Sequence, residues 1–169
     1  KLVMVAVSTG TEGQYIMSRS CARLGMHSEH YLGFMECNFI GTTFNTYDCG
    51  VGDETPATGA ELGAALPSIA RRKLMTITYD TNVLGRVPNS LQVCLDSHTP
   101  AKHFKSRQAV WNEDLMAWTM EFKGRARLPS KKNFQLVAPE DTHAKTPPVY
   151  FLFGKLSKDV FAVDYRAPM

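Results

Sequence analysis

Short runs in which apolar and polar residues alternate, separated by turn residues, recur along the whole chain. In the run 74–79, Met75, Ile77 and Tyr79 fall on one face and the threonines on the other, and 118–123 alternates in the same way. A period of two is typical of β-strands with one packed and one solvated face. Repeated runs of this kind favour an antiparallel sandwich or barrel. We predict strands at 2–7, 14–18, 31–35, 42–47, 74–79, 90–95, 117–123, 134–137, 149–153 and 160–164.

One stretch, 50–68, breaks this pattern because it is rich in Gly, Ala, Thr and Pro. We interpret it as a mobile loop that connects two strands. The chain has 169 residues, which is the size of one domain or of part of one. We therefore expect residues 1–169 to form a single, mainly β domain that contains this loop. No apolar run approaches the ~20 residues of a membrane-spanning helix, so no transmembrane segment is predicted.

Charge is distributed unevenly along the chain. The net charge is +3, but the first 66 residues carry three Lys or Arg against seven Asp or Glu, and the rest carry sixteen against nine. Within the basic part, alternation along a strand would place Arg125 and Arg127 on one face, with Lys131 and Lys132 nearby. Two interpretations of this basic patch stay open: a surface for lipid headgroups or nucleic acid, or an ordinary solvated strand edge.

The chain shows no sequence signature of catalysis. It has no GxxxxGK[ST] phosphate loop and no GxSxG nucleophile elbow. Its four cysteines are far apart and its five histidines follow no ligand spacing, so neither a metal site nor a cofactor is predicted. We therefore expect a protein that is not an enzyme. Trp111 and Trp118 are interpreted as packing anchors, and the methionines, Met116 among them, as core residues.

Several segments carry a resemblance to a known family. They are GTTFNTYD at 41–48, YDTNVLG at 79–85, VWNED at 110–114, FKGR at 122–125, KNFQLV at 132–137, and FGK at 153–155 through DVFAVDY at 159–165. In this order they resemble the C-terminal domain of the tubby-like proteins, from about Gln14 to Pro168. The resemblance implies a closed antiparallel β-barrel around a hydrophobic C-terminal helix. It also implies non-enzymatic work, because tubby-like domains bind phosphoinositides such as phosphatidylinositol 4,5-bisphosphate and act as membrane-tethered adaptors, several of them in trafficking to cilia.

This chain departs from the family pattern where the lipid is held. The family reads Gly-Lys-Leu-Arg-Ser-Asn where this chain has GFMECN at 33–38, and the family Lys after Gly-Thr is Thr43. The basic residue at the head of the next long strand is retained as Arg71, with Arg72 and Lys73 beside it. The resemblance therefore implies a phosphoinositide site at these three cations, reduced in charge, since phosphates need several convergent cations.

The lost cations are the family Lys, now Phe34, and the family Arg, now Glu36. At ~1 kcal/mol per basic residue near an anionic surface, these changes weaken lipid binding by on the order of 3 kcal/mol. Our leading hypothesis is a tubby-like adaptor that binds protein partners, ciliary ones included, and binds phosphoinositides more weakly than the family does. We expect it in the cytoplasm, peripheral to a membrane or to a cilium.

Two alternatives stay open. The first is a structural component of a cilium or axoneme that has lost lipid binding. The second is a nucleic-acid-binding or transcription-related protein, located in the nucleus, which would use the basic segment 102–132. Base stacking needs exposed aromatics among the cations, and Phe104 is the only obvious candidate there.

The chain ends at Met169, where the resemblance places the start of the helix that fills the barrel. An empty apolar cavity costs ~24 cal/mol per cubic ångström. We therefore expect either that the 169 residues belong to a longer product or that another segment fills the lumen.

Overall fold

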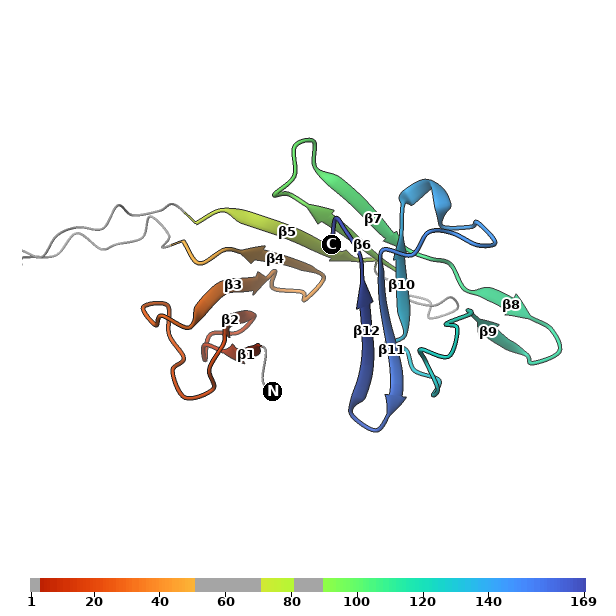
Figure 1. The fold of residues 1–169 in the computed structure, drawn as a ribbon, viewed down its shortest axis with the longest axis horizontal. Helices are drawn as coiled ribbons and strands as arrows, with labels where there is room; N and C mark the ends of the chain where they lie inside the picture. Colours follow the sequence, from red (N-terminus) through yellow and green to blue (C-terminus); the bar gives the residue numbers. More distant parts are fainter. Residues whose placement is uncertain (1–3, 51–70, 81–89) are drawn as a thin grey trace, which may run out of the picture. The chain divides into compact units, whose positions relative to one another are not determined.

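A computed structural model describes residues 4–50, 71–80 and 90–169. These residues form two compact units (Figure 1). The N-terminal unit comprises Lys1–Thr76 and Asp96–Thr99, and the C-terminal unit comprises Ile77–Leu95 and Pro100–Met169. In the described part of the chain, β-strands predominate and the helical structure is one 3₁₀ turn, Pro139–Asp141. The prediction of a mainly β protein is therefore confirmed.

The N-terminal unit is an antiparallel meander. Its strands are β1 (Val5–Ser8), β2 (Gln14–Ser18), β3 (Tyr31–Cys37), β4 (Thr43–Tyr47) and the first residues of β5 (Lys73–Tyr79). Strands adjacent in sequence pair with one another, and the register sets Phe34 opposite both Ile16 and Tyr47. Paired residues lie on the same face of a sheet, so Phe34, Glu36 and Tyr47 share one face.

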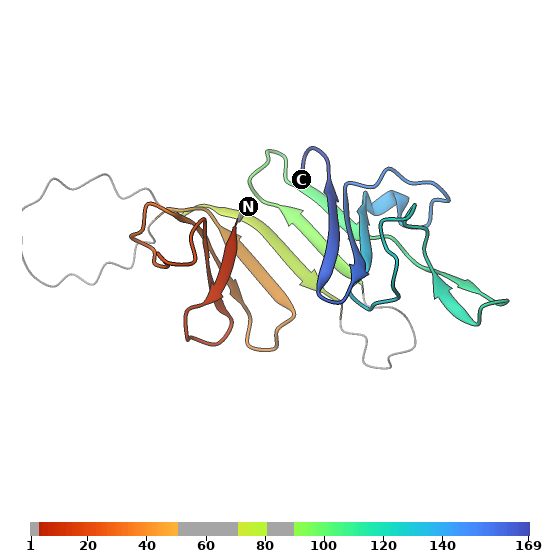
Figure 2. The ribbon, with the colours of Figure 1, turned by 60° about the horizontal axis from the view of Figure 1, so that its bottom comes forward.

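The C-terminal unit holds the rest of β5 and a second set of strands, shown in green to blue in Figures 1 and 2. Their order in the sheet is β5, β6, β7, β10, β11, β12, so the chain leaves the sheet between β7 and β10. There it forms a separate hairpin of β8 and β9. The new strands are β6 (Leu91–Leu95), β7 (Lys102–Ser106), β8 (Val110–Asn112), β9 (Ala117–Thr119), β10 (Phe134–Val137), β11 (Phe151–Ser157) and β12 (Val160–Tyr165).

The two faces of this second set of strands differ in chemistry. One face, the apolar face, is buried on β6 and β7 and carries stacked phenylalanine rings on β10, β11 and β12. At its edge on β12, Val163 and Tyr165 are exposed. The registers of the paired strands assign it Val93, Phe104, Leu136, Phe134, Phe151, Phe153 and Phe161. The opposite face, the polar face, carries Gln135 next to Leu152, and Leu152 next to Asp164. Loops cover part of the polar face, and the candidate pocket described below lies there.

Several strand predictions need correction. The segments 14–18 and 134–137 are strands with the predicted bounds, but the strand predicted at 117–123 ends at Thr119. The cause is a turn at 122–125, in which Lys123 and Gly124 have φ of 48° and 78° and the Arg125 N–H donates to the Phe122 carbonyl at 2.9 Å. The alternation predicted through Phe122 is therefore wrong. Strands β7 and β8 were not predicted at all.

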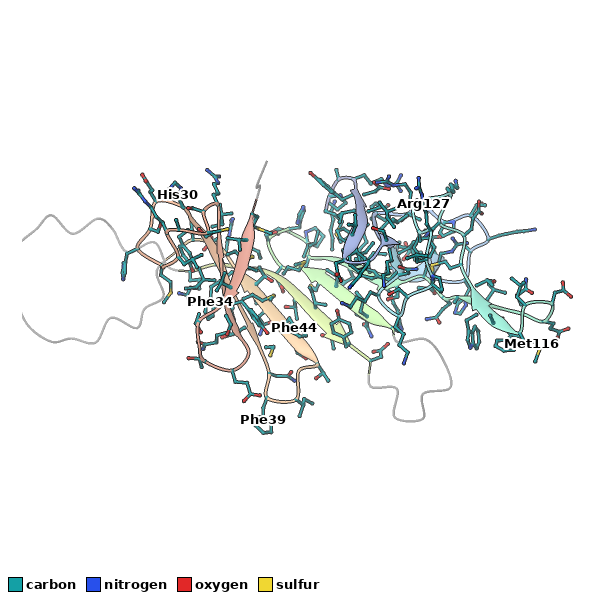
Figure 3. All side chains as sticks on the ribbon, turned by 90° about the horizontal axis from the view of Figure 1, so that it is seen from below. His30, Phe34, Phe39, Phe44, Met116 and Arg127 are labelled. Atoms are coloured by element: carbon teal, nitrogen blue, oxygen red, sulfur yellow. The ribbon has the colours of Figure 1, made fainter. Side chains whose placement is uncertain are left out.

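The β8–β9 hairpin corrects two further predictions. Trp111 and Trp118 are opposite each other, with ring centroids 5.6 Å apart and an interplanar angle of 70°. They pack edge-to-face on one another and stay 44% and 43% exposed, so they do not anchor a core. Met116, predicted as a core residue, is 74% exposed at the tip of the hairpin (Figure 3). The turn forces this position outward, since Met116 has φ of 46° and its N–H donates to the Glu113 carbonyl.

The predicted loop at 50–68 lies outside the described residues, apart from Gly50. The assignment of residues 1–169 to a single domain stays a prediction. In the described ranges, no helix is long and apolar enough to cross a membrane.

Candidate functional site

Arg71, at the head of β5, is the centre of the predicted phosphoinositide site. Its guanidinium carbon lies 4.8 Å from the centroid of the Phe34 ring, which is only 5% exposed. Its Nη2 lies 3.4 Å from the Met26 sulfur, and its Nε donates to the Gly50 carbonyl at 3.4 Å. The cation therefore stacks on an aromatic ring, which is a favourable cation–π arrangement. Among the described residues, the hydrogen bonds of its edge are long and go to uncharged acceptors, and the nearby Asp48 carboxylate interacts with it electrostatically.

The two neighbouring cations are each paired with a carboxylate. Arg72 Nε lies 3.6 Å from Asp48 Oδ2, and Lys73 Nζ lies 3.7 Å from Asp96 Oδ1. Burial opposes ionisation of Asp48, but the backbone N–H groups of Arg72 and Gly50, together with the nearby guanidinium charges, outweigh it and lower its pKa. The Asp48 carboxylate is thus anionic at neutral pH. The three predicted site cations are brought together at one strand end, but two of them are partly neutralised.

The two residues that replace family cations make new contacts of their own. Phe34 supports Arg71, and its ring lies 6.4 Å from that of Tyr47. The Tyr47 hydroxyl donates to Glu36 Oε1 at 2.6 Å. This hydrogen bond raises the pKa of Tyr47 to about 12, with smaller contributions from burial and from the Glu36 charge. Thr43, where the family has a third cation, donates its backbone N–H to Asn38 Oδ1 at 2.9 Å and shapes the β3–β4 turn.

One residue of the alternative basic patch, Arg125, is paired with a carboxylate. Arg125 donates two hydrogen bonds to Asp164, from Nε at 2.6 Å and from Nη2 at 2.5 Å. These bonds raise the pKa of Arg125 and lower that of Asp164. Arg127 lies outside any strand, so the prediction that strand alternation aligns it with Arg125 is wrong. The reason is again the turn at 122–125, which ends the regular backbone before both residues.

The other two residues of the patch lie near the β11–β12 hairpin or in solvent. Lys132 Nζ sits 5.8 Å from the centroid of the Phe161 ring, and Lys131 is exposed. Arg127 N–H donates to the Lys155 carbonyl, so its backbone also runs along β11 (Figure 3). Arg125 lines the pocket of the C-terminal unit that is described below.

Sequence reasoning missed the carboxylates that oppose the cations and a second group of cations in the C-terminal unit. That second group is Arg107, Lys123, Lys145 and Arg166, which line the same pocket as Arg125. No local spacing signals it, because its members come from four separate segments. In the described part of the chain, no group of three or more His, Cys, Asp or Glu side chains is placed to hold a metal ion.

Comparison with known proteins gives a consistent result. A sequence model described as the Tub family matches residues 2–105 and 97–169. The chain is 29% identical over 229 residues to Tubby-like F-box protein 2 of Arabidopsis thaliana, with all of the chain and 58% of that protein covered. It is 30% identical over 185 residues to Tubby-related protein 3 of Homo sapiens, covering 92% of the chain and 39% of that protein. It is 28% identical over 184 residues to Tubby-related protein 1 of Mus musculus, covering 92% and 32%. The chain thus spans between about a third and somewhat over half of the length of these relatives.

Proposed function

Because the chain belongs to the Tub family, we propose that it is a non-enzymatic tubby-type adaptor that binds a protein partner and contacts phosphoinositide membranes weakly through Arg71. The observation that carries the lipid half is the state of Arg71. One face of its guanidinium rests on Phe34, and among the described residues its N–H groups make long contacts to a carbonyl and a thioether. An arginine held in this way is suited to a phosphate, because its planar fork is already oriented and these hydrogen bonds are weak enough to be exchanged for stronger ones to phosphate oxygens.

The same site explains why the contact is weak. Glu36 places a carboxylate on the same face of β3 as Phe34, and its oxygen is held by Tyr47. Arg72 is paired with Asp48, and Lys73 is paired with Asp96, so both cations are partly neutralised. A headgroup that engages Arg71 therefore meets cations that are partly compensated by nearby carboxylates, those of Glu36 and Asp48 among them. Specific membrane recruitment would depend on the protein partner as well as on the lipid.

We further propose that the strands close into a tubby-type barrel with the apolar face of the C-terminal unit directed inward. This proposal is supported by the exposure of Val163 and Tyr165 on β12, which continue the apolar face of the neighbouring strands. Exposed apolar side chains that extend an apolar face often mark a surface that another segment covers. An apolar segment inside the barrel would cover it.

Vesicle flotation tests the lipid contact. Vesicles of phosphatidylcholine with and without phosphatidylinositol 4,5-bisphosphate are compared for wild type, Arg71→Ala and the control Arg19→Ala, an exposed arginine of the same unit. We expect weak, lipid-dependent recruitment that is lost in Arg71→Ala and kept in Arg19→Ala. The variant Glu36→Arg replaces a negative charge with a positive one at a half-buried position and keeps the Phe34 ring, so binding should rise about 30-fold at ~1 kcal/mol per unit of charge. Recruitment of wild type that ignores Arg71 would refute the proposed site.

The paired state of Arg72 and Lys73 favours one alternative, a structural component of a cilium or axoneme without lipid binding. Fractionation of ciliated cells separates the two. An adaptor is released by mild detergent with the membrane fraction, whereas a structural component stays in the axonemal pellet.

A further inference from the structure

A pocket of about 390 Å³ lies on the polar face of the C-terminal unit. Gln135 on β10 and Leu152 on β11 line it and face each other in register, and Asp164 on β12 is opposite Leu152. Residues from the loops 121–125 and 145–149 complete its walls. The pocket is formed within one unit and is separate from Arg71, so it is not part of the site proposed above.

The charges that line this pocket are predominantly positive. Two carboxylates, those of Glu121 and Asp164, face five cations. The cations are Arg107, Lys123, Arg125, Lys145 and Arg166. Asp164 is engaged by both hydrogen bonds of Arg125, which leaves the other four cations with Glu121 as the remaining carboxylate of the lining. The pocket therefore favours an anionic ligand.

Arg107 is fixed in place without being neutralised. Its Nη1 donates to Gln135 Oε1 at 3.1 Å, and its Nη2 donates to the Lys145 carbonyl at 2.9 Å. Gln135 is itself 2% exposed and is held by the hydrogen bond from its Nε2 to the Glu121 carbonyl at 2.7 Å. Both acceptors of Arg107 are uncharged, so the network positions a guanidinium and preserves its charge. A preformed cation of this kind binds a carboxylate with little loss of side-chain entropy.

Lys123 is placed beside the pocket by an unusual backbone. It occupies the left-handed region with φ of 48°, in the turn closed by the hydrogen bond from Arg125 N–H to Phe122. A non-glycine side chain in this region is strained, because its Cβ approaches the backbone closely. Lys145 stands on the opposite loop and is exposed. Two flexible, accessible lysines thus flank the fixed Arg107.

Part of the pocket lining is apolar, which narrows the class of ligand. Phe122, Pro147, Pro148, Val149 and Leu152 lie beside the cations. A phosphorylated inositol ring or a free phosphate is polar throughout and would leave this surface uncovered. We propose that the pocket binds an acidic peptide segment of a partner protein, with a carboxylate near Arg107 and a neighbouring apolar side chain against the prolines and Leu152.

Fluorescence anisotropy with a labelled peptide tests this site on the full chain. The probe is fluorescein-labelled Ser-Glu-Asp-Leu-Leu-Ser, and two comparison peptides replace either the acidic pair with Gln-Asn or the leucines with serines. We expect the first peptide to bind and both comparison peptides to lose most of the affinity. Lys145→Glu should weaken binding about tenfold or more, since it places a like charge beside the carboxylate. Lys158→Glu, at an exposed turn residue outside the pocket, should leave binding unchanged.

Three results would overturn the proposal. The first is absence of peptide binding, and the second is equal binding of the peptide without acidic residues. The third is equal binding of the serine peptide together with displacement by inositol hexakisphosphate, which would assign the pocket to polyphosphates. Arg71→Ala is measured in the peptide assay as well, and its peptide binding should equal that of wild type. The lipid contact and the peptide pocket can therefore be refuted independently of each other.

Discussion

The guanidinium of Arg71 rests on the ring of Phe34, with 4.8 Å between the guanidinium carbon and the ring centroid. The resemblance to the tubby-like domains implies that Phe34 stands where the family pattern has a lysine. On that alignment the substitution removes one cation of the proposed site and gives Arg71 an aromatic support. Positive charge at this site is therefore reduced in amount but fixed in position, which is a different basis for anion contact from a cluster of mobile cations.

Phe34→Ala should destabilise the protein strongly. The ring is 5% exposed, and removal of a buried phenyl side chain leaves a cavity that typically costs about 3–5 kcal/mol. Urea unfolding followed by far-ultraviolet circular dichroism measures the loss. The matched control is Phe39→Ala in the β3–β4 turn, because Phe39 is 99% exposed and points away from the strands (Figure 3). Equal unfolding midpoints for the two variants would contradict the burial of Phe34.

Tyr47 should ionise well above the ordinary tyrosine pKa of about 10. Its hydrogen bond to Glu36 raises its pKa to about 12, and unfolding returns it to about 10. Since the folded state holds this proton more tightly, its contribution to stability is complete below about pH 10 and is lost as the pH rises toward 12. The phenolate difference spectrum between wild type and Tyr47→Phe isolates this group. In Glu36→Gln the titration should shift to lower pH, because the nearby negative charge is gone. A Tyr47 component that titrates at the ordinary tyrosine value of about 10 would show that the hydrogen bond does not form.

Strands with apolar alternation could be predicted from the sequence, whereas β7 could not. Only Phe104 is apolar in Lys102–Ser106, and Ser106 is buried. The Ser106 hydroxyl accepts a hydrogen bond from Leu91 N–H at 2.9 Å and donates to the Leu91 carbonyl at 3.2 Å, which satisfies it inside the sheet. A buried polar residue of this kind breaks the period-two pattern of apolar and polar residues, so the alternation that predicts a strand is absent from β7.

The candidate site was predictable in one part only. The resemblance identified Arg71 as the retained cation, and Arg71 lies just before the first residue of β5, Lys73. Its surroundings depend on strand pairing between distant residues, which sets Glu36 beside Tyr47 and brings Asp48 to Arg72. No local pattern specifies these pairs. The predicted alignment of Arg125 with Arg127 is wrong for a local reason. Strand alternation was extended across the turn at Lys123 and Gly124, where the backbone is not extended.

Gly154→Ala should destabilise the C-terminal unit through a steric clash. A Cβ at this position would lie 2.5 Å from the Arg125 carbonyl oxygen and 3.1 Å from the Ala126 Cβ. Insertion of extra atoms into a packed site typically costs about 1–3 kcal/mol. Thermal unfolding compares it with Gly10→Ala, where no atom lies within 4 Å and the penalty comes only from a φ of 89°. If Gly154→Ala is the less destabilised of the two, the close approach of residues 125–126 to β11 is wrong.

Tryptophan spectroscopy should report on the β8–β9 hairpin alone, because the two tryptophans of the chain, Trp111 and Trp118, both lie on it. Their edge-to-face contact at 5.6 Å predicts an exciton couplet in the far-ultraviolet circular dichroism, and their exposure predicts ready quenching by acrylamide. Trp111→Phe should abolish the couplet, whereas Leu115→Ala, at the exposed end of the hairpin, should leave it unchanged. Because exposed aromatic surface often marks an interaction site, a bound protein partner that covers the hairpin should reduce quenching. A blue-shifted emission that resists acrylamide in the isolated chain would show that the hairpin is instead packed against the sheet.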